Sequence, residues 1–304
     1  MEYSNRELAS ISAEWALVLR NSAELEESPE KKPKILQQAL DRIEDAINKN
    51  NSKPDYYEIK GLLFTDLSLL QHGDDSLSTL EKANSAFQLS AMHQNSYKTH
   101  FQWARNLYSM SRIAQQKEKQ TRYLDEADKR FSIAVELRNN HPDLFYYWGV
   151  CLIFLSRMSS YNAAKRPLTI KAIDKLNTCV NLKKDSLDAH FHLGASQFII
   201  WKESDKEEQP LYFRDAFYHF EWTVSLFHNI PGFYFKAEEI EIFRGNPFQF
   251  VRTLENYYQM EPLWELWIGP TDVNPVFLKT IEAAVKREKE ALLEKTQDGE
   301  EVQS

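Results

Sequence analysis

Apolar and polar residues follow one another along this chain with the spacing of α-helices. The segment Asp143–Met158 (DLFYYWGVCLIFLSRM) is apolar on nearly all sides, which predicts a buried helix. The segment Leu168–Leu182 has apolar residues three and four positions apart, which predicts an amphipathic helix with one buried face. Gly149, in the first segment, costs about 1 kcal/mol of helix propensity relative to Ala. We therefore expect Gly149 to lie where another helix packs closely.

Two series of residues repeat at the same step. The first series is a single small residue. It consists of Ala16, Gly61, Ala104, Gly149 and Gly194, at intervals of 45, 43, 45 and 45 residues. The second series is a small residue, a large apolar residue four positions later and another small residue three positions after that. Its members are Ala39/Ile43/Ala46, Ala83/Phe87/Ser90, Ala127/Phe131/Ala134, Ala172/Leu176/Cys179 and Ala216/Phe220/Thr223, at intervals of 44, 44, 45 and 44 residues. Two series with one period indicate stacked copies of a two-helix unit.

In these positions the chain resembles the tetratricopeptide repeat (TPR) family. That family has a small residue, usually Gly, on the first helix of each unit and Ala-x3-Phe-x2-Ala on the second. Tyr147-Trp148-Gly149, followed by Ala172-x3-Leu176-x2-Cys179, is similar to one such unit, and the resemblance covers about residues 8–227. It implies an all-α fold, a right-handed α-solenoid whose five antiparallel helix pairs occupy residues 1–229.

The repeat unit of this chain is longer than the family's unit. The family's period is 34 residues, whereas the period here is about 45 residues. The additional residues fall between the first and the second helix, in polar segments such as QHGDDSLSTLEK and QQKEKQTRYLDE. Eleven residues are about three helical turns, which favours longer helices joined by a polar loop.

The repeat pattern stops after Phe227. Residues 230–275 contain ten aromatic residues interrupted by turn-forming Pro and Gly, and we expect them to cover the last helix pair as an aromatic-rich cap. A segment that folds into the groove, or that itself binds a partner, stays open as the alternative. We expect a C-terminal helix in residues 276–296 and a disordered acidic tail in residues 297–304.

Composition and the N-terminal residues add expectations about binding partners, the cysteines and cellular location. The formal net charge of −8 disfavours non-specific nucleic-acid binding, which needs a basic face. The two cysteines, Cys151 and Cys179, both fall at repeat positions and are expected to be buried thiols. The first 20 residues contain no secretory or membrane-spanning pattern, so we expect a cytoplasmic protein, with a place on the surface of an organelle or membrane left open.

The sequence contains none of the common catalytic or nucleotide-binding motifs. GxxxxGK[ST], GxGxxG, HExxH and GxSxG do not occur. His190 and His192 are two residues apart and would diverge on a helix, so no metal site is expected there. We therefore expect no cofactor and no enzymatic activity, and interpret the chain as a protein-interaction scaffold or adaptor. A helical-repeat subunit of an enzyme complex stays open as the alternative.

The resemblance also implies where a partner would bind. In the family, the first helices line a concave groove, and residues at fixed distances from the small residue point into it. The matching positions that suggest a partner-binding groove are Phe101, Arg105, Tyr108, Tyr146, Tyr147, Phe191 and His192. Tyr, Phe and Arg are residue types that dominate the binding energy of interfaces. Packing of these aromatic residues against neighbouring helices is the alternative.

One use of the family can be tested on these positions. Members that hold the C-terminal tail of Hsp70 or Hsp90 bind its carboxylate with Lys and Asn at two groove positions of several units. The matching positions here hold Glu58/Leu62, Phe101/Arg105, Tyr146/Val150 and Phe191/Ala195. Because only Arg105 could bind a carboxylate, a Hsp70/Hsp90 tail receptor is not expected.

Overall fold

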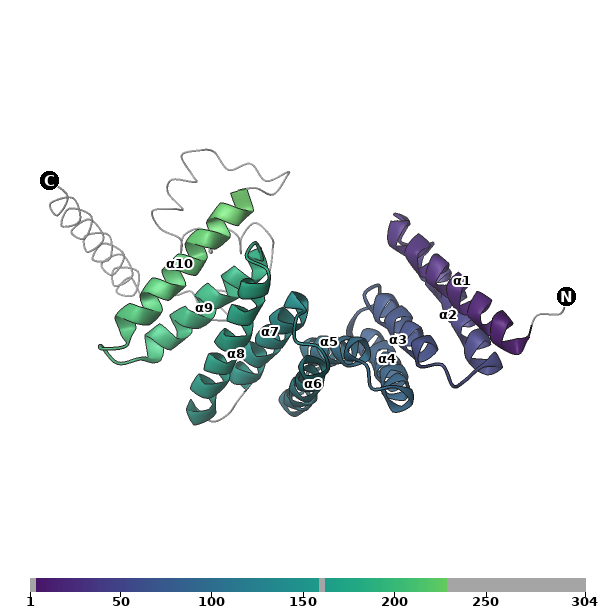
Figure 1. Ribbon diagram of the computed structural model, residues 1–304, viewed down its shortest axis with the longest axis horizontal. Helices are drawn as coiled ribbons and strands as arrows, with labels where there is room; N and C mark the ends of the chain where they lie inside the picture. Colours follow the sequence, from purple (N-terminus) through teal and green to yellow (C-terminus); the bar gives the residue numbers. More distant parts are fainter. Residues whose placement is uncertain (1–3, 159–161, 229–304) are drawn as a thin grey trace. The chain divides into compact units, whose positions relative to one another are not determined.

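The computed structural model describes residues 4–158 and 162–228. These residues form ten helices and no strand, which confirms the all-α class (Figure 1). The helices are α1 (Asn5–Leu25), α2 (Lys32–Lys49), α3 (Pro54–Ser68), α4 (Gly73–His93), α5 (Tyr97–Ile113), α6 (Lys117–Leu137), α7 (Pro142–Met158), α8 (Asn162–Leu182), α9 (Leu187–Glu203) and α10 (Gln209–His228). The expected cap, C-terminal helix and tail, residues 230–304, lie outside the described residues.

The chain divides into two compact units, and the boundary lies within α8. The first unit ends at Lys175 and the second begins at Leu176. In the first unit, α1 packs on α2, α3 on α4 and α5 on α6. The α7–α8 pair is joined by the hydroxyls of Ser156 and Thr169, 2.9 Å apart. In the second unit, α9 packs on α10. The structure thus confirms an α-solenoid of helix pairs.

Local sequence explains where several helices begin. Ser4 and Glu7 form a capping box, in which the Ser4 hydroxyl accepts the Glu7 N–H and the Glu7 carboxylate accepts the Ser4 N–H. Pro54 occupies the first turn of α3, where a missing N–H costs nothing. The additional residues of each unit lengthen the second helices, since α4, α6 and α8 each have 21 residues.

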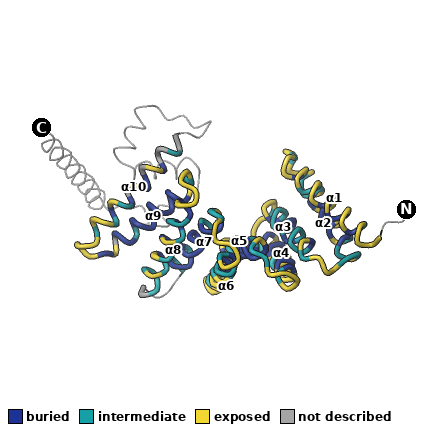
Figure 2. The backbone as a smooth tube through the Cα atoms, in the orientation of Figure 1, coloured by how far each residue is buried: buried dark blue, intermediate teal, exposed yellow. Residues whose placement is uncertain are grey.

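The two repeated series meet in the core of each pair. A Cβ atom added to Gly61 would lie 2.6 Å from the Phe87 ring, and one added to Gly194 would lie 2.7 Å from the Phe220 ring. Phe87 and Phe220 are fully buried. Buried residues therefore follow the facing sides of the paired helices, and exposed residues the outer sides (Figure 2). No helix of the described residues is both long and apolar enough to span a membrane.

Candidate functional site: aromatic and arginine residues of α5 and α7

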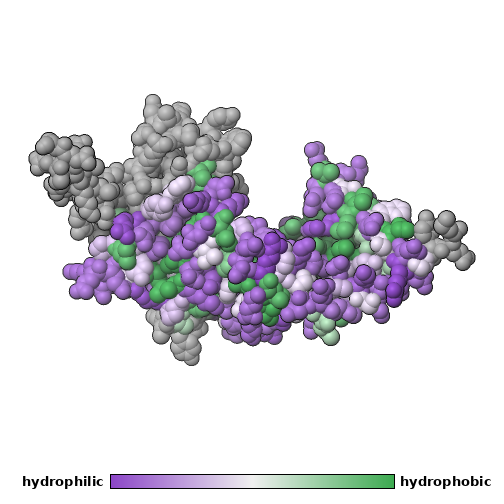
Figure 3. Space-filling view, in the orientation of Figure 1, coloured by the Kyte–Doolittle hydropathy of each residue, from purple (hydrophilic) through white to green (hydrophobic). Residues whose placement is uncertain are grey.

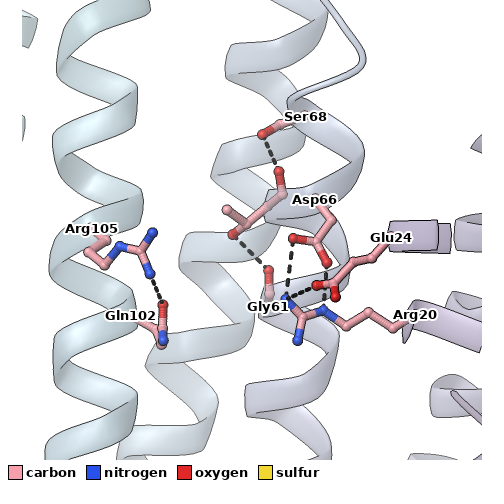
Figure 4. Close-up of polar contacts among 8 residues, drawn as sticks. Arg20, Glu24, Gly61, Asp66, Ser68, Gln102 and Arg105 are labelled. Atoms are coloured by element: carbon pink, nitrogen blue, oxygen red, sulfur yellow. Dashed lines mark hydrogen bonds and ion pairs between the residues drawn. The ribbon is translucent and has the colours of Figure 1, made fainter. Parts of the chain in front are cut away.

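The first helices of the first unit are linked to one another by polar contacts. Arg20 of α1 donates to Asp66 of α3, with 2.5 Å between Nε and Oδ2, and Glu24 lies 3.8 Å from the same guanidinium (Figure 4). Thr99 of α5 donates to Glu58 of α3 at 2.7 Å. These contacts hold α1, α3 and α5 beside one another, so that residues at matching repeat positions form a continuous surface.

Arg105 links α5 to α7. Its guanidinium lies 4.5 Å from the centre of the Tyr147 ring and donates to the Tyr147 hydroxyl over 3.5 Å. A second donor of the guanidinium contacts the amide oxygen of Gln102 at 3.2 Å (Figure 4). Both acceptors are neutral, and Arg105 stays partly exposed. The guanidinium is therefore oriented by an aromatic ring, while its charge is not neutralised by any carboxylate among the described residues.

Phe101, Tyr146 and Tyr147 form an aromatic group around Arg105. Phe101 lies 5.9 Å from Tyr147 and 6.4 Å from Phe131 of α6, measured between ring centres. Tyr146 meets Tyr147 edge-on at 5.1 Å. Phe101 is buried and the two tyrosines are partly exposed. The structure thus brings four of the predicted groove residues together. The buried Phe101 ring packs against Tyr147 and Arg105 from the interior side.

Tyr108 belongs to a second group further along α5. Its ring meets Phe154 of α7 edge-on at 5.5 Å. The guanidiniums of Arg112 and Arg157 lie 5.5 Å and 5.2 Å from the centre of the Phe154 ring. Burial raises the pKa of Tyr108 to about 12, so its phenol stays protonated at neutral pH. Sequence reasoning missed Phe154, Arg112 and Arg157, although their spacing from the small residues of α5 and α7 could have indicated them.

Phe191 and His192 of the second unit have different surroundings from the α5 and α7 residues. Phe191 is buried and packs edge-on against Phe220 of α10, with 6.3 Å between ring centres. His192 is buried, and its Nδ1 lies 2.7 Å from the carbonyl oxygen of Asp188. Burial lowers the pKa of His192. Both side chains belong to the packed interior, so the candidate surface is limited to α5 and α7.

A buried histidine pair is a further feature that sequence reasoning missed. His190 and His219 are 29 residues apart in sequence, and their Nδ1 atoms lie 2.9 Å apart. Nε2 of His190 lies 3.0 Å from the carbonyl oxygen of Lys184, which requires a proton on that nitrogen. His219 then donates from Nδ1 to Nδ1 of the neutral His190. Burial and the neighbouring His190 lower the pKa of His219 to about 4.

Metal-binding and thiol chemistry find no support among the described residues. These residues contain no group of three or more His, Cys, Asp or Glu residues that could hold a metal ion. His190 and His192 diverge, as predicted, because His190 faces α10 while His192 bonds within α9. Cys151 and Cys179 are buried thiols, as predicted, and burial raises the pKa of Cys151 well above its usual value. The Cys151 thiol is therefore not a ready nucleophile.

No family model matches the sequence, and no curated protein matches it. The structure is similar to several solved structures. One is a thermophilic TPR protein, TTC0263 of Thermus thermophilus, with 12% identity, a TM-score of 0.46, and 79% of this chain and 99% of that one covered. Another is MamA from Desulfovibrio magneticus RS-1, with 14% identity, a TM-score of 0.47, and coverage of 71% and 97%. A third is YrrB, a TPR protein with an unusual peptide-binding site, with 15% identity, a TM-score of 0.43, and coverage of 70% and 87%.

The chain is a TPR-like helical repeat protein by its own architecture. Its helices pack in consecutive pairs, and the small residue of a first helix packs against the large apolar residue of the following helix, as Gly61 does against Phe87. The unit of about 45 residues, with second helices of 21 residues, distinguishes it from the 34-residue TPR unit.

Proposed function

We propose that this protein is a non-catalytic scaffold or adaptor that binds a partner peptide or helix on the α5–α7 surface, which consists of Arg105, Tyr108, Tyr146 and Tyr147 over the buried Phe101. The observation that carries the proposal is the state of Arg105. Its guanidinium is oriented by Tyr147 and Gln102, is partly exposed, and has no carboxylate partner among the described residues. A guanidinium in this state can bind a carboxylate from another chain with little loss of side-chain entropy.

The chemistry of the surface suggests the chemistry of the partner. Arg105 gives the α5–α7 surface a positive charge in a chain whose formal net charge is −8. Tyr146 and Tyr147 offer apolar ring surface, and the Tyr147 hydroxyl lies beside Arg105. A peptide or amphipathic helix with an acidic residue next to apolar side chains fits this combination, because the carboxylate meets Arg105 while the apolar groups cover the rings.

The test uses a variant that removes the rings and reverses the charge. Full-length protein carrying Tyr146→Ala, Tyr147→Ala and Arg105→Glu should recover its partners from a cell extract at about one tenth of the wild-type level or less, because interface Tyr and Arg each contribute on the order of 2 kcal/mol. Circular dichroism and a thermal melt establish that the variant is folded. Partners recovered at wild-type levels by folded variant would overturn the proposal.

A matched control separates the α5–α7 surface from a general effect of charge. Arg122 is exposed on α6, and Arg122→Glu changes the net charge by the same amount as Arg105→Glu. We expect Arg122→Glu to recover partners at wild-type levels.

Once a partner is identified, Glu→Lys or Asp→Lys in the bound segment should restore binding to the Arg105→Glu protein and weaken binding to wild type. If no Glu→Lys or Asp→Lys substitution in the bound segment restores binding to the Arg105→Glu protein, Arg105 does not contact a carboxylate of the partner.

A further inference from the structure

Two junctions between successive helix pairs use the same tryptophan contact. Trp103 of α5 directly precedes the small residue Ala104, and its indole N–H donates to the side-chain oxygen of Asn84 on α4 at 2.5 Å. Trp148 of α7 directly precedes Gly149, and its indole N–H donates to the carboxylate of Asp128 on α6 at 2.6 Å. In both cases the acceptor directly follows the small residue of the preceding second helix. The contact therefore belongs to the repeat.

Two further contacts recur with the tryptophan. A cation from the following helix lies over the ring, since Arg130 is 3.6 Å from the centre of Trp103 and Lys175 is 4.6 Å from the centre of Trp148. The side chain two positions after the small residue also donates to a carbonyl of the preceding second helix. Asn106 bonds to the Leu80 carbonyl at 3.0 Å, and the Cys151 thiol to the Leu124 carbonyl at 3.7 Å.

Helix α1 has the tryptophan of this junction and, from α2, its cation, but no hydrogen-bond acceptor among the described residues. Trp15 directly precedes the small residue Ala16, and the Arg42 guanidinium lies 4.1 Å from the centre of its ring, in the position of Arg130 over Trp103. Among the described residues, however, no side chain or carbonyl accepts a hydrogen bond from the Trp15 indole. The tryptophan is thus held in the arrangement of the internal junctions without the acceptor that those junctions provide.

The exposure of matching residues shows how unusual the α1 surface is. Ile11, Trp15 and Val18 are 48%, 49% and 60% exposed, and we call these three residues the α1 face. Figure 3 shows apolar residues on the surface of the N-terminal helix pair. The matching residues of α5 are Thr99, Trp103 and Asn106, at 1%, 5% and 1%. Those of α7 are Leu144, Trp148 and Cys151, at 0%, 5% and 0%. The α1 face thus keeps the apolar residues of a stacking surface, although no described helix covers it.

We propose that the α1 face binds an amphipathic helix of a partner protein, in the place that α4 takes on α5 and α6 takes on α7. The two internal junctions define the chemistry of that helix. Both α4 and α6 have the pattern Leu-x2-Ala-(Asn or Asp)-x2-Phe, as Leu80/Ala83/Asn84/Phe87 and Leu124/Ala127/Asp128/Phe131. In the partner, the Leu and Ala cover Ile11 and Val18, and the Asn or Asp accepts the hydrogen bond from Trp15. This surface shares no residue with the α5–α7 surface.

A head-to-tail contact through α10 of a second copy does not match the internal junctions. The last described second helix is α10, and a head-to-tail contact would place it against α1 of another copy. The residue after its small residue Ala216 is Phe217, whose side chain has no oxygen to accept the Trp15 N–H. A partner helix with Asn or Asp at that position therefore matches the observed junctions, and α10 of a second copy does not.

The α6 sequence itself supplies the probe. A fluorescent peptide of residues 117–137, with an Asp125–Lys129 lactam to stabilise the helix, is titrated with the full-length protein. Asp125 and Lys129 are four residues apart and exposed in α6, so the lactam leaves the contact residues unchanged. We expect binding to wild type, weakened about fivefold by Trp15→Phe, which keeps an aromatic ring but removes the N–H donor. Leu17→Ala, at an exposed residue on another side of α1, should not weaken it.

The same peptide with Asp128→Ala completes a double-mutant cycle. It should bind wild type about as weakly as the native peptide binds the Trp15→Phe protein, and combining the two changes should add little. No binding to wild type, or equal binding to wild type and Trp15→Phe, would overturn the proposal. Additive losses in the cycle would also overturn it, because they would show that Trp15 and Asp128 do not contact each other. Sedimentation that shows a wild-type dimer lost on Trp15→Ala would instead assign the α1 face to a second copy.

Discussion

Helices α5 and α9 have the same position in the repeat, yet they present different surfaces. Three and two positions before the small residue, and one and four after it, α5 has Phe101, Gln102, Arg105 and Tyr108, and α9 has Phe191, His192, Ala195 and Phe198. On α5 only Phe101 is buried, whereas on α9 all four residues are buried. Repeat position therefore predicts the side of the helix on which a residue lies. It does not predict whether that side faces solvent.

The largest expected effect is at the small residue of α9. Gly194→Leu forces a side chain into the Phe220 ring, whose atoms would lie 2.7–3.0 Å from the new Cβ. Overpacking of this kind costs about 1–3 kcal/mol or more in the free energy of unfolding, measured by urea denaturation. Glu203→Leu adds the same side chain at an exposed position of α9 and should change stability little. A Gly194→Leu protein as stable as the Glu203→Leu protein would show that the ring can move aside.

Matching substitutions two positions before the small residue should separate the two helices directly. His192→Ala removes a buried ring and should lower the free energy of unfolding by about 1–3 kcal/mol. Gln102→Ala changes a partly exposed side chain and should lower it by no more than about 0.5 kcal/mol. Chemical denaturation of both variants measures the difference. Equal losses would contradict the distinction between a packed α9 side and an accessible α5 side.

Acid should destabilise the α9–α10 pair through His219. Its pKa is lowered from 6.5 to about 4 in the folded chain, so the unfolded chain binds more protons between these values. The stability that His219 contributes is complete above about pH 6.5 and is lost as the pH falls toward about 4. Urea denaturation at about pH 7.5 and about pH 5 measures this loss, which His219→Asn should reduce.

His100 of α5 provides the comparison for that experiment. It occupies the repeat position of His190, its Nε2 lies 2.6 Å from the side-chain oxygen of Asn95, and burial lowers its pKa. We expect His100→Asn to reduce the acid sensitivity less than His219→Asn does, because the pKa shift of His219 is the large one. A greater reduction by His100→Asn would place the main acid-sensitive group on α5.

The smallest effect should come from making α5 more like α9. Tyr108 occupies the position of Phe198, and its hydroxyl bonds to Arg112. Tyr108→Phe removes that hydrogen bond but keeps the ring against Phe154, so the free energy of unfolding should fall by about 0.5–1.5 kcal/mol. Denaturation of the variant, with Tyr218→Phe at an exposed site as control, measures this value. A larger loss would show that the hydroxyl organises more of the α5–α7 surface.

The sequence predicted the helices well where the apolar pattern was strong. Helix α7 was expected at Asp143–Met158 and extends over Pro142–Met158. Helix α8 was expected from Leu168, but it begins at Asn162 and continues through Pro167. Proline normally disfavours a helix interior. A tertiary contact stabilises this turn, since the hydroxyl of Ser156 on α7 donates to the Lys165 carbonyl at 2.9 Å.

The candidate site could be predicted only in part. Repeat position alone was enough to predict four neighbouring residues, because residues at matching positions of adjacent first helices must lie side by side. In the structure these four residues do lie together: Phe101, Arg105, Tyr146 and Tyr147. The same rule placed Phe191 and His192 on a groove, although both are buried. Exposure depends on what packs against a helix from elsewhere in the chain, and a local spacing rule contains no information about that.

The sequence by itself determined the repeat, because a close contact such as Gly61 against Phe87 requires a small residue and a large one at fixed spacing in every unit. It also determined which tryptophans match, since Trp15, Trp103 and Trp148 each precede a small residue. Only the tertiary structure decided that Trp103 and Trp148 reach an acceptor on a preceding helix while Trp15 remains exposed. It alone paired His190 with His219. Period is a property of neighbouring residues in the chain, whereas burial and hydrogen-bond partners depend on residues that folding brings together.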